Sequence, residues 1–203
     1  MFRQGLYSVQ IIACRLIAGD NMKFCNVCGG SINRLIPKGD NRERYVCSDE
    51  ACGEIHYQNP RIITGCLPIY KEQILLCRRA IEPRLGLWTL PAGFLENQET
   101  TQQGAERESL EEANANLDIK ELYTIFDIPH INQVYFFYRA ELLDTHFSPG
   151  IESLDVKLFK IEDIPWDELA FPAIKKTLEY YIEDSAKQQF KFRSAILEPS
   201  VAR

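Results

Sequence analysis

From residue 61 onward, short apolar runs alternate with polar turns in a way that predicts a β-sheet. The segments RIITGCLPIY (61–70) and QILLCRR (73–79) are separated only by Lys-Glu, as in a β-hairpin. In NQVYFFYRAELL (132–143), apolar residues recur at every second position from Val134 to Leu142, so their side chains share one face of a strand. Two further strands are predicted in ELYTIFDIP (121–129) and DVKLFKI (155–161).

Two segments carry helical signals. Thr100 or Thr101 can cap the amino terminus of one helix, and Asn114 can end it in the left-handed conformation. Pro172 suits the first turn of a second helix, in which apolar residues recur at helical spacing. The polar segment from about Asp184 onward is predicted to be loose. Strands, one helix, more strands and a closing helix together predict an α/β fold, with a mixed sheet covered by helices.

Composition narrows the class of protein. With 203 residues, 45% of them hydrophobic, the chain suits one mid-sized domain and a small module. The formal net charge of −6 argues against non-specific binding to nucleic acid or to an anionic membrane. No apolar run approaches the roughly 20 residues that a membrane span needs. Residues 1–21 lack a clear positive start and a small-residue cleavage site, so we expect a poorly ordered upstream extension, with a targeting segment left open.

Four of the seven cysteines form two close pairs. Cys25 and Cys28 are separated by two residues, Cys47 and Cys52 by four, and 18 residues lie between the pairs. Two turns that each present two thiolates predict a tetrahedral structural zinc site, and His56 is close enough in sequence to replace one cysteine. The alternative is four unrelated thiols. An odd number of cysteines without a secretory signal also favours a reducing, cytoplasmic location.

A cluster of glutamates marks the first predicted helix. Glu108, Glu111 and Glu112 lie at i, i+3 and i+4, so their carboxylates share one face and repel one another. A hard divalent cation neutralises such a set, because magnesium, manganese and calcium accept oxygen-only ligands. Arg107 can pair with Glu99 in the loop before the helix. On composition alone, a solvated acidic face is the competing interpretation.

The spacing of these residues resembles the Nudix box, G-x5-E-x7-R-E-U-x-E-E-x-G-U, in which U is a large aliphatic residue. Three positions depart from it: Ser109 and Ala115 replace aliphatic residues, and Asn114 replaces the last glycine, a mild change because Asn tolerates the left-handed conformation. The matching positions are Gly93, Glu99, Arg107, Glu108, Glu111 and Glu112.

The whole chain resembles Nudix hydrolases that carry an amino-terminal zinc ribbon. The resemblance implies an α/β/α sandwich and a Mg2+ or Mn2+ site formed by the Gly93 carbonyl with Glu108, Glu111 and Glu112. It also makes Glu108 a candidate base and gives Arg107 and Glu99 the role of holding the loop and the helix in register. Glu152 is a candidate for the late acid of this family, or else a plain surface acid. The expected domains are an extension (1–21), a zinc ribbon (22–58), a Nudix domain (59–184) and a tail (185–203).

The activity expected from the resemblance is hydrolysis of the pyrophosphate bond of a nucleoside diphosphate derivative, with ADP-ribose or FAD favoured and AMP released. The S-Q-P-W-P-F-P-x-S array of NADH pyrophosphatases is missing after the box, which counts against NADH or NAD, the alternative substrates. Pro129 lies near the downstream proline of ADP-ribose pyrophosphatases. Aromatic residues that can stack on an adenine or flavin ring, or else lie in the core, are Tyr57, Trp88, Phe126, Tyr135 and Phe137.

A binding module is the competing class of function. Some Nudix domains act as non-catalytic ligand sensors, but a degraded box loses its glutamates and this one keeps them. A ribbon that binds nucleic acid needs a basic face, yet residues 22–60 contain five Lys or Arg and five Asp or Glu. The expected partner is therefore a small nucleotide rather than nucleic acid or a membrane, and a homodimer is left open.

Overall fold

The computed structural model describes residues 22–199, and the predicted extension, with Cys14, lies outside them. Within that range the chain divides after residue 60 into a small unit (22–60) and a large unit (61–199). In the part of the chain so described, neither helix combines the length and the apolar character needed to cross a membrane.

The small unit is a three-stranded antiparallel sheet with almost no hydrophobic core. Its strands β1 (Ile32–Leu35), β2 (Arg44–Cys47) and β3 (Ile55–His56) pair in that order. Large apolar side chains such as Phe24 and Val27 are exposed, at 66% and 68%. A segment this short with so little core needs a further source of stability.

The large unit is built on a mixed eight-stranded sheet. Its main path runs in the order β10-β5-β4-β9-β8-β11, and β6 and β7 pair with β5 and β4. The pairs β4–β9 and β8–β11 are parallel, whereas the other pairs are antiparallel. The strands are β4 (Arg61–Tyr70), β5 (Gln73–Arg79), β6 (Trp88–Thr89), β7 (Ala92–Phe94), β8 (Leu117–Ile128), β9 (Gln133–Leu142), β10 (Ser153–Lys160) and β11 (Arg193–Ile196).

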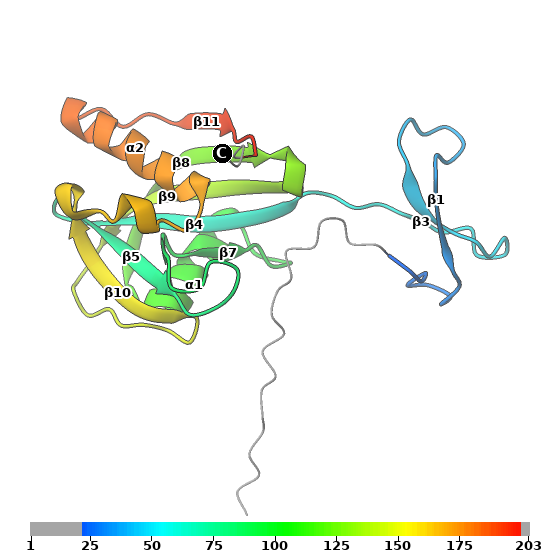
Figure 1. The fold of residues 1–203 in the computed structure, drawn as a ribbon, viewed down its shortest axis with the longest axis horizontal. Helices are drawn as coiled ribbons and strands as arrows, with labels where there is room; N and C mark the ends of the chain where they lie inside the picture. Colours follow the sequence, from blue (N-terminus) through cyan, green and yellow to red (C-terminus); the bar gives the residue numbers. More distant parts are fainter. Residues whose placement is uncertain (1–21, 200–203) are drawn as a thin grey trace, which may run out of the picture. The chain divides into compact units, whose positions relative to one another are not determined.

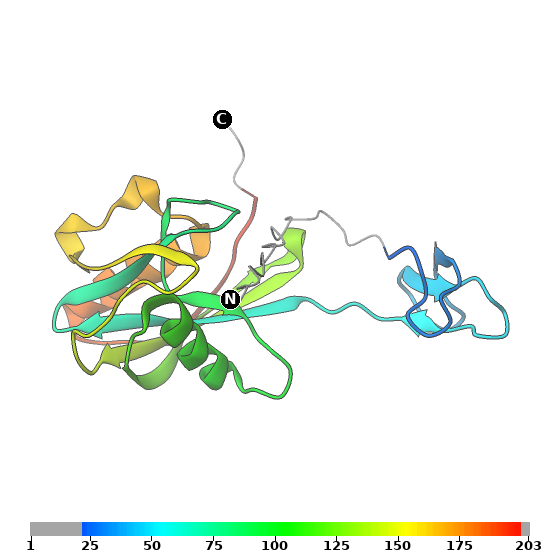
Figure 2. The same ribbon diagram turned by 90° about the horizontal axis from the view of Figure 1, so that it is seen from below.

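Helices cover both faces of this sheet. Helix α1 (Thr101–Ala113) and helix α2 (Pro172–Lys187) lie on different sides of it (Figures 1 and 2). The main core packs beneath α2 and includes Ile174 and Leu178, and smaller apolar clusters lie beneath α1. The α/β/α sandwich with a mixed sheet is therefore confirmed. Three single-turn 3-10 helices complete the unit, at Pro129–Ile131, Ile161–Asp163 and Trp166–Glu168.

Both ends of α1 follow the sequence signals. Thr100 is the N-cap and forms a capping box with Gln103, and Asn114 ends the helix in the left-handed conformation with φ 47°. Ser109, one of the departures from the box, is fully buried, and its hydroxyl donates to the Ala105 carbonyl at 2.8 Å. The small side chain therefore packs beneath the helix without an unsatisfied polar group.

The prediction of a loose tail from Asp184 is wrong for the described residues. Helix α2 continues to Lys187, and the chain returns as β11, which pairs in parallel with β8. Asp184 is only 2% exposed and accepts hydrogen bonds from the Tyr123 hydroxyl at 2.9 Å and from the Arg193 guanidinium. A segment that looks polar in sequence is ordered because its charges neutralise one another inside the fold.

Replacing Asp184 by asparagine should lower the free energy of unfolding by about 2–3 kcal/mol, because charge-assisted hydrogen bonds are lost at a buried site. Burial alone would raise the pKa of Asp184, but the hydrogen bonds from Arg193 and Tyr123 outweigh it and lower the pKa. The stabilisation of the fold by ionised Asp184 is therefore complete above the unfolded pKa of about 3.9. It disappears as the pH falls through the lower pKa of the folded protein. Urea unfolding at pH 7 and at pH 3 measures both effects.

The control for this prediction is Asp163→Asn, which removes an exposed carboxylate of the same unit. Its free energy of unfolding should stay within about 0.5 kcal/mol of the parent value. Equal stability of the Asp184→Asn protein and the parent at pH 7 would mean that the hydrogen bonds of Asp184 with Tyr123 and Arg193 do not hold β11 in place.

Candidate active site and zinc site

The glutamates of α1 gather at one face of the helix, and two of them are buried. Glu108 is 9% exposed and Glu112 5%, whereas the side chain of Glu111 is 58% exposed. Burial, reinforced by the charge of Glu108, raises the pKa of Glu112 to about 8. Burial also raises the pKa of Glu108, although Arg107 opposes that shift. The positive charge of Arg107 therefore does not fully offset the cost of ionising these buried carboxyl groups.

Arg107 joins the helix to the loop before it. Its guanidinium donates to both carboxylate oxygens of Glu99, from Nε at 3.0 Å and from Nη2 at 2.8 Å. The other terminal nitrogen donates to Glu108 at 2.7 Å and to Glu111 at 3.0 Å. These hydrogen bonds hold the pKa of Glu99 down at about 2. The bidentate pair fixes the loop against the helix, the arrangement that the sequence predicted for Arg107 and Glu99.

Gly93 packs directly on the carboxylate of Glu108. A Cβ at this position would lie 2.4 Å from the carboxyl carbon and from both oxygens, so no other residue fits without a shift. The neighbouring Ala92 amide donates to Glu112 Oε2 at 3.2 Å. Gly104 plays a similar part that the sequence did not indicate, because a Cβ there would lie 2.7 Å from Glu99.

The chemistry of these donors suits a hard divalent cation, but among the described residues only the four cysteines, and not the glutamates, bring their ligand atoms within 4.8 Å of one another. The donors on and beside α1 are oxygen atoms only, they lie beside a glycine backbone, and two of the carboxylates have pKa values raised by burial. A bound cation would relieve that unfavourable charge, which is the physical basis for expecting a metal here.

The loop that carries Glu152 is attached to the end of α1. Ser148 N donates to the Ala113 carbonyl at 2.9 Å, and Gly150 N donates to the Glu112 carbonyl at 3.0 Å. Glu152 itself is exposed, but its charge contributes to the raised pKa values of Glu108 and Glu112. The structure therefore places Glu152 within electrostatic reach of the buried glutamates.

A Gly150→Ala substitution should disturb this attachment. The new Cβ would lie 1.7 Å from the Glu111 carbonyl oxygen, so the loop must move away from the helix. We expect a loss of about 1–3 kcal/mol in stability, as is typical of overpacking. A fall of about tenfold or more in kcat should accompany it if Glu152 takes part in the reaction. Pro149→Ala alters an exposed neighbour and should leave both quantities nearly unchanged. Thermal unfolding and steady-state kinetics test this, and wild-type values for Gly150→Ala would show that the attachment is unimportant.

Most of the candidate aromatic residues belong to the core. Phe126 and Phe137 are fully buried and Trp88 is 6% exposed, all within the cluster beneath α2. Tyr57 is 63% exposed and belongs to the small unit. Tyr135 is half-buried on β9, so it is the one of the five that combines partial exposure with the large unit.

The four predicted cysteines of the small unit come together. Their Sγ atoms all lie within 4.8 Å of one another, with Cys25 and Cys52 at 3.8 Å and Cys28 and Cys47 at 3.4 Å. A tetrahedral site with Zn–S bonds of about 2.3 Å has sulfurs about 3.8 Å apart, so the four thiols fit zinc. His56 is buried at 7% exposure but is not a member of this group.

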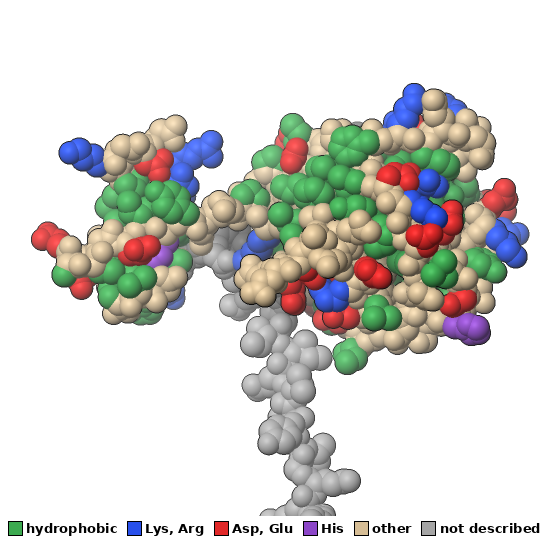
Figure 3. Space-filling view, turned by 180° about the vertical axis from the view of Figure 1, so that it is seen from behind, with side chains coloured by type: hydrophobic (Ala, Val, Ile, Leu, Met, Phe, Trp, Pro, Cys, Tyr) green, Lys and Arg blue, Asp and Glu red, His purple; other side chains and the backbone are tan. Residues whose placement is uncertain are grey.

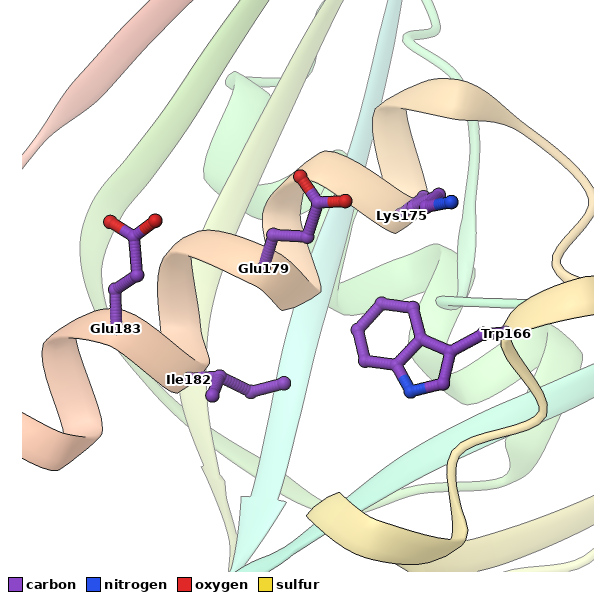
Figure 4. A pocket seen from close by; sticks show the side chains of 5 residues that line it. All are labelled: Trp166, Lys175, Glu179, Ile182 and Glu183. Carbon is purple, nitrogen blue, oxygen red and sulfur yellow. The ribbon is translucent and has the colours of Figure 1, made fainter.

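A separate depression of about 390 Å³ lies along α2 (Figure 4). It contains none of the predicted site residues, and its acidic groups already have partners. Glu179 pairs with Lys176 at 3.1 Å, and Glu183 pairs with Arg193 at 3.4 Å. The remaining lining residues are Trp166, Lys175 and Ile182.

Comparison with known families identifies both units. Residues 59–181 match the NUDIX domain family, and residues 23–58 match the Nudix N-terminal family, a zinc ribbon. The first match spans more than half of the chain. The protein therefore belongs to the Nudix family and is a Nudix hydrolase with an amino-terminal zinc ribbon, as the resemblance of the box implied.

Similar proteins are known from solved structures and from curated sequences. A NUDIX hydrolase from Nitrosomonas europaea has 52% identity and a TM-score of 0.83, over 87% of this chain and 99% of that one. The NAD-capped RNA hydrolase NudC of Stutzerimonas stutzeri is 26% identical over 79% of this chain, which spans only 55% of that protein. The ADP-ribose pyrophosphatase of Methanocaldococcus jannaschii is 25% identical over 61% of this chain and 75% of its own length.

Proposed function

We propose that this Nudix hydrolase cleaves the pyrophosphate bond of a nucleoside diphosphate derivative, with ADP-ribose or FAD favoured, and releases AMP. The observation that carries the proposal is the pair of buried glutamates, Glu108 and Glu112, held beside Gly93 and Arg107. Support for the substrate comes from the relative named ADP-ribose pyrophosphatase.

In this proposal, the Gly93 carbonyl, Glu108, Glu111 and Glu112 hold Mg2+ or Mn2+. Such an ion supplies positive charge beside the phosphates and lowers the pKa of water. Glu108 accepts the proton from the attacking water, because its raised pKa brings it closer to neutral pH than an exposed glutamate. Arg107, bound to Glu99, keeps the carboxylate of Glu108 in place. Glu152 is the second candidate for the base, since its charge also acts on this cluster.

An NADH or NAD pyrophosphatase is the second candidate function. The relative named NAD-capped RNA hydrolase NudC favours it, because that name indicates a substrate that contains NAD. The missing array after the box points the other way, so the two candidates need a direct test.

Binding of nucleic acid by the zinc ribbon has less support. Two of the arginines in the small unit are paired with acids, Arg34 with Glu43 at 3.2 Å and Arg44 with Asp40 at 2.8 Å. On the face of the molecule shown in Figure 3, Lys and Arg side chains lie next to Asp and Glu side chains. Paired charges of this kind attract a phosphate backbone weakly.

The test is a hydrolysis panel with Mg2+ or Mn2+ and with ADP-ribose, FAD, NADH, NAD+ and an NAD-capped RNA, followed by chromatography of the products. Preference for ADP-ribose or FAD, with AMP as a product, supports the proposal. Preference for NADH, NAD+ or the capped RNA would replace it with the second candidate. Absence of turnover with tight binding of one compound would indicate a sensor.

The cytoplasmic location, the homodimer and the domain limits stay predictions.

A further inference from the structure

Strand β11 forms one end of the eight-stranded sheet, beyond β8, and its outer edge is open (Figure 1). In the described part of the chain it pairs only with β8, where the Leu197 amide also donates to the Asp127 carbonyl at 2.9 Å. The backbone groups of successive residues point to opposite edges of a strand. The N–H and C=O groups of Ser194 and Ile196 therefore point away from β8, and such an edge can accept a further strand.

The opposite end of the sheet, β10, is protected against such pairing. It carries charged side chains, among them Asp155 and Lys157, which form an ion pair at 2.7 Å, and its register with β5 is irregular next to Asp155. Charged side chains and irregular strands prevent the edges of two sheets from joining. Strand β11 has neither protection, because its register with β8 is regular and its one charged residue, Arg193, is neutralised by Asp184.

The side chains that flank the open edge are apolar. Arg193 and Ala195 face α2, because Arg193 bonds to Asp184 of that helix and Ala195 packs against the main core. Side chains alternate along a strand, so Ile196 points to the other face, where it is 62% exposed. Phe192, directly before the strand, is 57% exposed. Two large apolar side chains at an unpaired edge form a surface suited to a protein partner.

We propose that β11 pairs antiparallel with β11 of a second copy of this chain, about a two-fold axis at Ser194. In this register Phe192 of each copy lies opposite Ile196 of the other, so apolar side chains meet. Arg193 lies opposite Ala195, so like charges do not meet. The outward backbone groups of Ser194 and Ile196 make the hydrogen bonds between the copies. The segment is complementary to itself, as a two-fold interface requires, and the inference does not depend on the proposed activity.

The exposed area indicates a weak dimer. Phe192 and Ile196 together offer roughly 200 Å² of apolar surface per chain, since side chains of this size have about 150–250 Å² when fully exposed. With the strand backbone, the interface comes to about 800–1,000 Å² over both copies, below the roughly 1,200 Å² of stable interfaces. We therefore expect a dimer that dissociates on dilution, with a dissociation constant in the micromolar range.

The first test measures the dimer dissociation constant of the full chain by analytical ultracentrifugation. Ser194→Pro removes an outward N–H group and places a ring on the open edge, while the hydrogen bonds between β11 and β8 stay in place. The dissociation constant should rise at least about tenfold. The control is Ser194→Ala, which keeps the N–H group and should stay within about twofold of the wild type.

A second pair of variants tests the side chains. Ile196→Lys places a charge on the open edge and should also raise the dissociation constant at least about tenfold. The control, Leu154→Lys, adds the same charge at a 55% exposed apolar position of β10, and it should stay within about twofold of the wild type. Thermal unfolding checks that the variants are folded, and Ile196→Lys decides the question if Ser194→Pro does not fold.

Amide hydrogen exchange identifies the edge that is used. In the wild type, the amides of Ser194 and Ile196 should become protected as the protein concentration rises through the dissociation constant. A wild type that is monomeric at every concentration overturns the proposal, and so does a dimer that both Ser194→Pro and Ile196→Lys leave unchanged. Protection of these amides at every concentration would mean that the same chain covers the edge, which also overturns it.

Discussion

A Glu112→Gln protein is expected to lose metal-dependent hydrolysis by a factor of about 1,000 while keeping its fold. Glutamine has nearly the same size as glutamate, and its amide oxygen can still accept the hydrogen bond from the Ala92 amide. What disappears is the negative charge that a divalent cation needs from this position. Steady-state kinetics on the best substrate of the panel measures the loss, and turnover within tenfold of the wild type would remove Glu112 from the metal site.

Stability should respond in the opposite direction from activity. A buried carboxylate without sufficient positive charge destabilises the folded protein, and Glu112 is 5% exposed with a pKa raised to about 8. In magnesium-free buffer, Glu112→Gln should therefore unfold at the same temperature as the wild type or a higher one. Added Mg2+ should raise the Tm of the wild type but not of the variant.

Glu106→Gln is the matched control for both measurements. Glu106 lies on the same helix, but its side chain is exposed. The substitution removes the same charge from α1 without touching the buried cluster, so activity should stay within about twofold of the wild type. The same Mg2+-dependent rise in Tm should also be retained. A loss in the Glu106 variant as large as that in the Glu112 variant would point to the net charge of the helix rather than to a specific ligand.

Cys25→Ser should lower the zinc content of the protein from about one ion per chain to a small fraction of that value. The thiol of Cys25 is buried, and its sulfur lies 3.8 Å from that of Cys52. A hydroxyl is a much poorer ligand for zinc than a thiolate. Because the small unit has almost no hydrophobic core, its folding free energy should depend mainly on the metal. Amide hydrogen exchange within residues 22–58 should therefore become fast in this variant.

Zinc analysis by plasma mass spectrometry, together with hydrogen exchange, tests this prediction. The control is Cys66→Ala, which removes a buried thiol of the large unit that lies outside the four-cysteine group. It should keep about one zinc per chain and slow exchange in the small unit. Normal zinc content in Cys25→Ser would contradict the four-cysteine site, and the buried His56 would then be the first replacement ligand to examine.

Local patterns were sufficient for much of the fold. The β4–β5 hairpin, strands β8, β9 and β10, and the start of α2 at Pro172 all follow from periodicity and turn residues. The capping box at Thr100 and the left-handed end at Asn114 were also readable, because caps depend on residues a few positions apart. The two-residue and three-residue strands β6 and β7 were missed, since so short a segment has no period to detect.

The sequence by itself determined the family, the two groups of candidate metal ligands and the order of the main elements. Those features depend on residue type at fixed spacing, which a linear chain displays directly. Tertiary structure decided the rest, namely the burial of Glu108 and Glu112 and the attachment of the Glu152 loop to α1 through Gly150. It also decided the ordering of the tail around Asp184. Each of these depends on atoms brought together from distant parts of the chain, where burial and neighbouring charge, rather than spacing, set the energy of a carboxylate or a guanidinium.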